Sequence, residues 1–403
     1  MVTARMAPSW HRIPLDPPVP ASRERELATR VFFVSDAILD FSLIRADPAP
    51  AAVTAVDLAV PAGTDIDDVA RKLRYVVAND VLAQRHLTPK TVWTGTARGK
   101  VRDVFPDLLR QGIAWEAGEG QITVGEPVLS LLDHLDVRIK DLVVRDFGAR
   151  AFRYPTLIPT AAMQRCRYFQ SFPHLMMVVS RLHADVDAYR GFLCDLDGGG
   201  DLADGLRAYA SGFDYCLPPT MCFHTYHQFA DGPLPGPALA VTARGKSFRF
   251  ESRYRRSLER LWDFTIREIV FIGPRDYVLD CRGRLMERTR ELMDALGLGG
   301  RCEVANDPFF VNADTAERVW SQHLLELKYE LRLPLEAGRD IAVSSFNFHD
   351  RFFGESFAIT TDDGAAYTAC AGFGLERLTY AFLCRHGADP RDWPPAIRKA
   401  VEP

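Results

Sequence analysis

The feature that most constrains the fold is a series of strand-like segments, from residue 214 onward, that do not alternate with helices. β-Branched and aromatic residues mark these segments, and examples are "ALAVTARGKSFRFES", "DFTIREIVFIG" and "DIAVSSFNFHDRFF". One long helix, which ends at Gly297, lies between two groups of these strands, and a final helix follows the last of them. Strands joined without regular helical crossovers predict an antiparallel sheet flanked by helices, so we expect an α+β fold and not a doubly wound one.

A smaller unit is predicted ahead of this sheet. Residues 1–25 are rich in proline and charge and are expected to form a loose arm. Strand-like stretches and a helix with apolar residues at helical spacing follow, and they predict an N-terminal α/β domain over residues 26–148. A boundary is expected near residue 150, where Pro155 and Pro159 bracket an apolar segment, so residues 149–403 would form the second domain.

Composition limits the compartment and the partners. The 403 residues contain no apolar window long enough for a membrane span and no signal-peptide core, so we expect a cytoplasmic protein without a membrane partner. A net charge of −4 provides no general attraction for a large polyanion, which weakens the case for nucleic acid. Eight cysteines without a CxxC pair are typical of buried thiols, so a metal site would need ligands far apart in sequence.

One segment concentrates positive charge in this acidic chain. "KSFRFESRYRRSLER" holds six basic residues and two glutamates, and arginine's planar guanidinium suits phosphate oxygens. A solvated, salt-bridged hairpin is the plainer interpretation. Strand alternation places Arg249 and Glu251 on one face, and it places Phe264 and Glu268 together on the returning strand. Glu268 is followed by hydrophobic residues, and a buried carboxylate needs a cation, a metal or a hydrogen-bond donor.

Two cysteines are candidates to join Glu268 in a metal site. Cys222 and Cys370 lie in segments that read as strands, and zinc accepts thiolate, imidazole and carboxylate ligands. No spacing rule connects the three residues, and His224 and His227 lie close enough to Cys222 to compete as ligands. An ion pair for Glu268 and buried thiols for the cysteines remain the alternative interpretation.

Taken in order, these segments resemble the catalytic domain of class II aminoacyl-tRNA synthetases. "FRYPTLIP" resembles the first motif of that class, which lies at a dimer interface, and "FRFES" with "RLWDFTIRE" resembles the second. "GFGLERL" resembles the third motif, a strand-to-helix turn. Within the class, the sequence is most similar to the zinc-dependent seryl-tRNA synthetases and to their shorter relatives, the amino acid:[carrier protein] ligases.

The resemblance implies a reaction and a set of residue roles. An AMP-forming ligase would activate a small amino acid (glycine, alanine or serine) with ATP as an aminoacyl-adenylate. Zinc, held by Cys222, Glu268 and Cys370, would take the free α-amino group of the substrate. The implied catalytic residues are Arg249, Glu251 and Arg377. The implied ATP-binding set comprises Arg249, Glu251, Arg255, Arg256, Phe264, Gly372, Gly374 and Arg377.

Magnesium is expected to accompany ATP, and here the chain departs from the family pattern. Enzymes of the seryl type have a glutamate ahead of the third motif, but this segment reads "IAVSSFNFHD", with Ala342 at the acidic position. Asp340, Glu330 or Glu355 would have to substitute for that glutamate.

Two acceptors fit the same adenylate. We favour the phosphopantetheine thiol of a carrier protein, because no heptad pattern predicts the coiled coil of common seryl enzymes and no basic N-terminal face is present. The N-terminal domain resembles a reduced form of the α/β domain of zinc-dependent seryl enzymes, which keeps tRNA open as the acceptor. A non-catalytic paralogue is a third interpretation, and Ala342 adds weight to it. The first motif also implies a homodimer.

Overall fold

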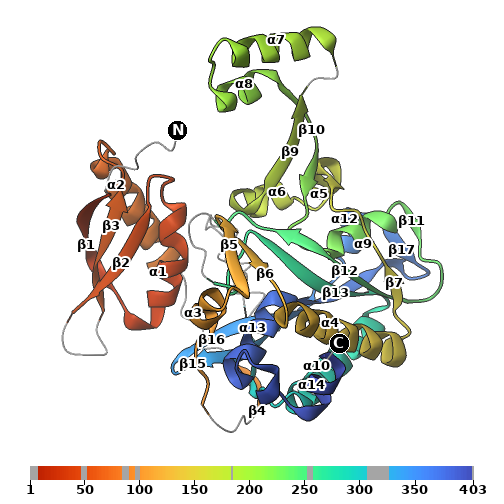
Figure 1. The fold of residues 1–403 in the computed structure, drawn as a ribbon. Coiled ribbons are helices and arrows are strands. Elements are labelled where there is room, and N and C mark those ends of the chain that lie inside the picture. Colours follow the sequence, from red (N-terminus) through yellow and green to blue (C-terminus); the bar gives the residue numbers. More distant parts are fainter. Residues whose placement is uncertain are drawn as a thin grey trace.

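In the computed structural model of the protein, an N-terminal module stands beside a larger body, and an arm projects from the body (Figure 1). Among the residues it describes, no helix is both long and apolar enough to cross a bilayer. The structure describes residues 8–46, 52–83, 90–95, 100–182, 185–251, 257–305 and 326–401.

The N-terminal module is a three-stranded antiparallel sheet with its own hydrophobic core. Its strands have the order β1-β3-β2, and the core is separate from those of the body. Of the expected loose arm, residues 1–7 lie outside the described residues. Residues 9–19 instead form the paired strand β1, whose Ile13, Leu15 and Val19 are buried in this core. The elements are β1 (Ser9–Val19), η1 (Ala21–Arg23), α1 (Glu24–Arg30), η2 (Val31–Phe33), β2 (Asp40–Arg45), β3 (Val53–Val60), α2 (Ile66–Val76) and the π-helix η3 (Val77–Leu82).

The body contains an eight-stranded sheet that is antiparallel except for its last pair. Its order is β4-β14-β15-β16-β19-β13-β12-β7, and β7 runs parallel to β12. This confirms the expected α+β class with an antiparallel sheet flanked by helices. The strands are β4 (Thr91–Gly95), β7 (Arg150–Phe152), β12 (Leu239–Phe248), β13 (Asp263–Gly273), β14 (Gly300–Val304), β15 (Lys328–Glu336), β16 (Arg339–Phe348) and β19 (Tyr367–Gly374).

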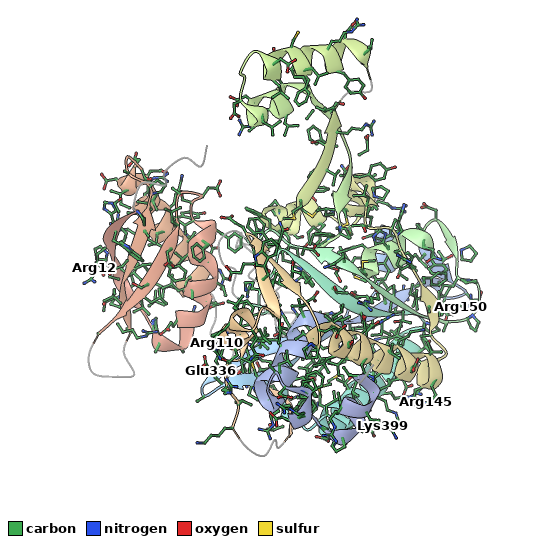
Figure 2. All side chains as sticks on the ribbon, in the orientation of Figure 1. Arg12, Arg110, Arg145, Arg150, Glu336 and Lys399 are labelled. Carbon is green, nitrogen blue, oxygen red and sulfur yellow. The ribbon has the colours of Figure 1, made fainter. Side chains whose placement is uncertain are left out.

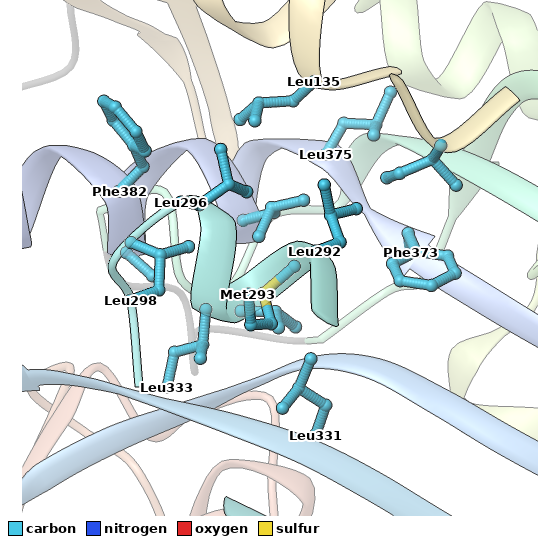
Figure 3. Close-up of a cluster of buried hydrophobic side chains, with 14 of the residues drawn as sticks. Leu135, Leu292, Met293, Leu296, Leu298, Leu331, Leu333, Phe373, Leu375 and Phe382 are labelled. Atoms are coloured by element: carbon cyan, nitrogen blue, oxygen red, sulfur yellow. The ribbon is translucent and has the colours of Figure 1, made fainter. Parts of the chain in front are cut away.

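Helices α4 (Val128–Phe147), α10 (Arg275–Ala295), α13 (Leu375–His386) and α14 (Pro395–Val401) pack against one face of this sheet. Figure 3 shows leucines of α4 and α10 meeting β15 and α13 side chains in that core. Strand alternation explains the two faces: Ile269 and Phe271 of β13 belong to this core, whereas Val270 and Ile272 belong to a second core on the opposite face. The second face carries Glu268 and Cys370.

The division between the module and the body differs from the expected one at residue 148. β4 pairs with β14 of the large sheet, and α4 buries Leu131, Leu135 and Ile139 in the same core as α10 and α13. Both elements were assigned to the N-terminal domain from sequence. By its packing, the N-terminal module therefore ends at η3, and the body begins at β4.

The arm consists of two paired strands that carry two helices. β9 (Met177–Leu182) and β10 (Ala210–Leu217) are antiparallel, and α7 (Val186–Asp197) and α8 (Leu202–Tyr209) lie at their far end (Figure 1). The remaining described elements of the body are α3 (Phe105–Arg110), β5 (Ala114–Gly118), β6 (Gln121–Val124), β8 (Ile158–Pro159), α5 (Thr160–Arg165), α6 (Tyr168–Ser171), η4 (Pro173–Leu175), α9 (Cys222–Gln228), β11 (Gly232–Pro233), α12 (Phe352–Ser356), β17 (Ile359–Thr361), β18 (Gly364–Ala365) and η5 (Pro390–Asp392).

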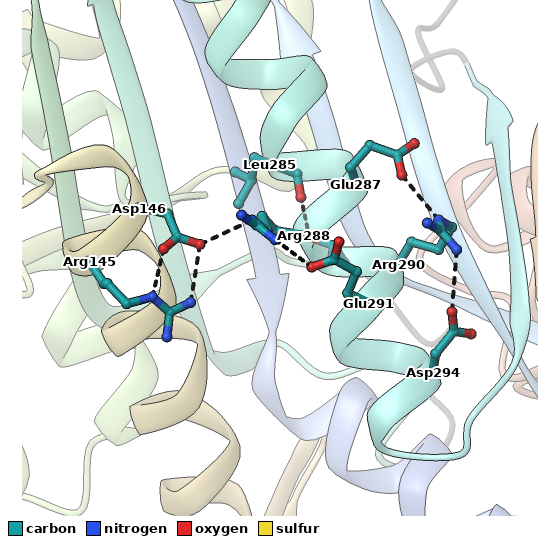
Figure 4. A network of polar contacts seen from close by, with 9 residues as sticks. Arg145, Asp146, Leu285, Glu287, Arg288, Arg290, Glu291 and Asp294 are labelled. Atoms are coloured by element: carbon teal, nitrogen blue, oxygen red, sulfur yellow. Dashed lines mark hydrogen bonds and ion pairs between the residues drawn. The ribbon is translucent and has the colours of Figure 1, made fainter.

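Ion pairs join α4 to its neighbours in two different environments. The pairs of Arg145 and Arg288 with Asp146 lie at the protein surface between α4 and α10 (Figure 4). The pair of Asp136 with Arg267 of β13 is buried and bidentate, with both oxygen–nitrogen distances 2.7 Å. Exposed pairs contribute little to stability, whereas removing one partner of a buried pair leaves an uncompensated charge.

We therefore expect Asp136→Asn to lower the free energy of unfolding by about 3–5 kcal/mol, because Arg267 would remain buried without its counter-ion. The matched control is Asp107→Asn, which breaks the pairs with the exposed Arg102 and Arg110 and should cost less than about 1 kcal/mol. Arg110 is labelled at the surface in Figure 2. Denaturant unfolding measures both variants, and an equally small effect of the two would contradict a structural role for the buried pair.

Candidate active site and metal centre

A cleft of about 2080 Å³ opens over the second face of the large sheet. Its walls come from β13, β15, β16 and β19, and the ends of the strands of the N-terminal module contribute Trp10, Asp40 and Ala59. The volume exceeds that of a typical small-molecule pocket, so it accommodates a nucleotide together with a second substrate. Six residues expected to bind ATP line it, namely Arg249, Glu251, Phe264, Gly372, Gly374 and Arg377. Arg255 and Arg256 lie outside the described residues.

Cys222, Glu268 and Cys370 meet at the floor of this cleft. One ligand atom from each lies within 4.8 Å of those of the other two, and all three residues are buried. Glu268 and Cys370 come together because β13 and β19 are adjacent, with Val270 opposite Cys370. Cys222 corrects one expectation, since it begins helix α9 and does not lie in a strand.

The two nearby histidines do not belong to this group. The buried His224 stacks on the ring of Tyr154, with 5.3 Å between ring centroids. The group of potential metal ligands at this place contains neither His224 nor His227.

The buried environment disfavours the ionised forms of Cys222, Glu268 and Cys370. It raises the pKa of Glu268 to about 7 and also raises the pKa of Cys222. The hydrogen bond with Cys222, followed by burial, raises the pKa of Cys370 well above its usual range. Two thiols and a carboxylate are a donor set that suits zinc, and a divalent cation would compensate their charges when they ionise. The residues therefore fit the zinc ion that the sequence analysis expects.

We call Cys222, Glu268 and Cys370 the metal group. Three polar side chains that surround it were not predicted from the sequence. Thr220 donates to Glu268 Oε2 at 2.6 Å, and Asn347 Nδ2 lies 3.5 Å from Cys370 Sγ. His349 Nε2 lies 3.7 Å from the same sulfur. Asn347 is the β16 partner of Cys370, so the register of these two strands was the signal that was needed. Such contacts orient metal ligands and tune their basicity.

Charged residues of the second and third motifs converge above the metal group. Arg249 donates from Nε to the carbonyl oxygen of Pro219 at 3.1 Å, and its guanidinium lies 5.6 Å from the ring centre of Phe264. Glu251 accepts from Arg260 at 2.7 Å. Burial, followed by the nearby charge of Arg260, lowers the pKa of Arg377 to about 10. The arrangement places several guanidinium groups in one cleft, as binding of a triphosphate requires.

Arg377 is held by backbone oxygens. Its Nε donates to the carbonyl of Glu259 at 2.6 Å and its Nη1 to that of Ala342 at 3.2 Å. These bonds fix the guanidinium at the start of α13, directly after the end of strand β19, which contains Gly372 and Gly374.

The two glycines differ in the space around them. A Cβ at Gly372 would lie 2.7 Å from Ile266 Cδ1 and 3.5 Å from Glu268 Oε2, whereas at Gly374 the nearest atom, in Arg377, is 3.7 Å away. We expect Gly372→Ala to lower the free energy of unfolding by about 1–3 kcal/mol through overpacking. Gly374→Ala, the matched control, should change it by less than about 0.5 kcal/mol. The midpoints of denaturant unfolding measure both variants. Equal midpoints for Gly372→Ala and Gly374→Ala would contradict close packing at Gly372.

The chain is similar to ligases of known sequence and to solved synthetase structures. No family model matches the chain. Amino acid–[acyl-carrier-protein] ligase 1 of Bradyrhizobium diazoefficiens is 35% identical over 257 residues, which cover 63% of this chain and 77% of that protein. Ligase 2 of the same organism is 36% identical over 257 residues, covering 63% and 75%. The type-2 serine–tRNA ligase of Methanocaldococcus jannaschii is 28% identical over 312 residues, covering 74% and 60%.

A solved structure resembles the fold over most of the chain. The crystal structure of M. kandleri SerRS in complex with A. aeolicus tRNASec superposes with a TM-score of 0.69 at 24% identity, covering 91% of this chain and 73% of that one. The protein therefore has the class II aminoacyl-tRNA synthetase fold. The chain belongs to the family of amino acid–[acyl-carrier-protein] ligases and is a ligase.

Proposed function

We propose that the protein activates a small amino acid with ATP and transfers it to the phosphopantetheine thiol of a carrier protein. The observation that carries this proposal is the convergence of Cys222, Glu268 and Cys370 with Arg249 and Arg377 in one cleft. The names of the relatives at 35% and 36% identity support a carrier protein as acceptor.

The proposed reaction has two steps. A carboxylate oxygen of the amino acid attacks the α-phosphorus of ATP, and pyrophosphate leaves. Arg249 contacts the α-phosphate and stabilises the charge that develops there, while Arg377 contacts the outer phosphates. The thiol of the carrier protein then attacks the carbonyl carbon of the adenylate, and AMP leaves.

The remaining cleft residues position the substrates in this proposal. Glu251 and Phe264 contact the adenine, and Gly372 and Gly374 allow its close approach to the backbone. Zinc bound by Cys222, Glu268 and Cys370 would offer a Lewis-acid position for the unprotonated α-amino group of the substrate. Because the metal group is buried, we propose glycine, alanine or serine as the amino acid.

We also propose that the protein is a homodimer through α4. Leu129, Val137 and Val144 lie along one side of this helix and remain 41–49% exposed in the single chain. Exposed apolar side chains on a helix whose other face is packed are typical of a surface that a partner covers, and the charged Asp133 and Lys140 between them would lie at the same contact. Sedimentation velocity tests this, since Val137→Asp should shift a wild-type dimer towards monomer, whereas a monomeric wild type would contradict it.

The experiment for the first step is ATP–pyrophosphate exchange on the zinc-loaded protein with glycine, alanine and serine in turn. Exchange that depends on one of them supports adenylation and identifies the substrate. A folded, zinc-containing protein without exchange for any amino acid would instead support the non-catalytic alternative.

Acceptor choice is tested with the activated amino acid. Holo carrier protein, apo carrier protein and tRNA are offered in parallel, with the labelled amino acid followed into each. Label on the holo form alone supports the phosphopantetheine thiol, because the apo form differs only in lacking that group. Label on tRNA would favour the seryl-tRNA synthetase alternative.

A further inference from the structure

The carboxylates that could hold magnesium beside ATP do not fit that role. Ala342 presents a methyl group where an acid was expected. The two oxygens of Asp340 accept from Arg332 Nε and Arg301 Nη1, each at 2.7 Å. Both oxygens of that carboxylate therefore already face a cation.

Glu330 is occupied in the same way. Its Oε2 accepts from Arg332 Nη1 at 2.9 Å, and its Oε1 lies 3.4 Å from Lys328 Nζ. Glu355, the third candidate, lies on α12 and does not line the cleft. Magnesium demands several oxygen ligands in near-octahedral geometry, and these three acids do not supply them at this position.

Arg332 itself lies where such an ion would be needed. In the register of β15 and β16 it is the partner of Ala342, and it lines the cleft although it is only 3% exposed. Glu330, which it contacts, also acts electrostatically on Arg377. The guanidinium donates from Nε to Asp340 and from Nη1 to Glu330, and its Nε also lies 3.5 Å from Glu303 Oε1. Nη2 has no hydrogen bond to a residue that the structure describes.

We propose that Arg332 takes the place of a protein-held divalent cation and donates from Nη2 to the phosphates of ATP. The inference rests on ATP as the nucleotide of the proposed function. A guanidinium held by Asp340, Glu330 and Glu303 needs no reorganisation when the nucleotide binds, and its Nη2 is a fixed, charge-assisted donor at the position opposite Ala342. The nucleotide then binds with one divalent cation fewer attached to the protein.

The test measures binding of the non-hydrolysable analogue AMPCPP to the full chain, in EDTA and in Mn²⁺. Arg332→Gln is expected to weaken binding in EDTA by about 10- to 100-fold, the loss typical of a hydrogen bond to a charged group. Arg301→Gln is the matched control, because it removes the other partner of Asp340 from outside the cleft lining and should leave the affinity unchanged.

If Arg332→Gln folds poorly, Arg332→Lys is the second variant, because its ammonium keeps the charge beside Asp340 and Glu330 but lacks the Nη2 donor. It should weaken AMPCPP binding in EDTA by a similar factor. A further pair of variants tests the missing acid. In Arg332→Gln/Ala342→Glu the missing acid is restored, so Mn²⁺ should rescue the affinity and electron paramagnetic resonance should count one more Mn²⁺ per complex than in wild type. Arg332→Gln/Ala342→Gln should show no rescue.

The outcomes separate the two proposals. Unchanged AMPCPP affinity of Arg332→Gln in EDTA, or a wild type that binds as many Mn²⁺ ions as the rescued variant, would overturn the role of Arg332 alone. Nucleotide binding without any amino-acid-dependent exchange would overturn the proposed function alone. A wild type that binds no AMPCPP under either condition would overturn both.

Discussion

Replacing Glu268 by glutamine is expected to reduce zinc to a small fraction of one ion per chain and to lower the rate of ATP–pyrophosphate exchange by more than about 100-fold. Loss of a contact to a metal ligand alone typically costs 10- to 100-fold in affinity or activity, and Glu268 is itself a proposed ligand. The amide keeps the shape of the side chain and can still accept from Thr220, so the change acts on charge and coordination. Metal analysis and exchange assays measure the two effects.

Cys216→Ala is the matched control for that experiment. Cys216 is a buried thiol in the same hydrophobic core as Cys222 and Cys370, but it donates to the carbonyl of Ile158 and is not in the metal group. It should retain zinc and exchange activity. If Glu268→Gln retained both as well, the buried carboxylate would not be a ligand.

Arg249→Lys is expected to lower kcat for exchange by about 100- to 1000-fold while changing the KM for ATP less, as is typical when a donor to a developing charge is lost. Lysine keeps the charge but lacks the planar fork, and it cannot reproduce the bond to Pro219 together with a phosphate contact.

The control for this variant is Arg110→Lys, at an exposed pair with Asp107, which should leave both constants unchanged. Steady-state exchange kinetics over a range of ATP concentrations give kcat and KM separately. A loss confined to KM would mean that Arg249 binds ATP without acting in the transition state.

The sheet could be predicted from sequence because strand composition and the lack of helical crossovers are local signals. The boundary of the N-terminal domain could not, since α4 is amphipathic whichever sheet it covers. Its core side chains Leu131, Leu135 and Ile139 show only that it packs against something. Likewise, proline and charge within residues 1–25 indicated a loose arm. Three of the prolines in fact lie inside β1, which pairs with β3 and buries Ile13 and Leu15 on one face.

The metal group illustrates the same limit at the site. Cys222, Glu268 and Cys370 are 46 and 102 residues apart, and no local rule connects them. Resemblance to a family suggested the set, and adjacent strands brought two of its members together. The polar neighbours Asn347 and Thr220 escaped notice because single polar residues in strands or loops carry no periodic pattern.

The net negative charge of the chain is located in the arm. Residues 177–217 contain three basic and seven acidic residues, which leaves 46 of each in the rest of the chain. The excess of −4 therefore resides in an element that contributes no residue to the cleft lining. At physiological ionic strength, fields between exposed charges are largely screened beyond about 8 Å. An approaching acceptor responds to the charges immediately around the cleft mouth, so the whole-chain average does not decide between an RNA and a protein.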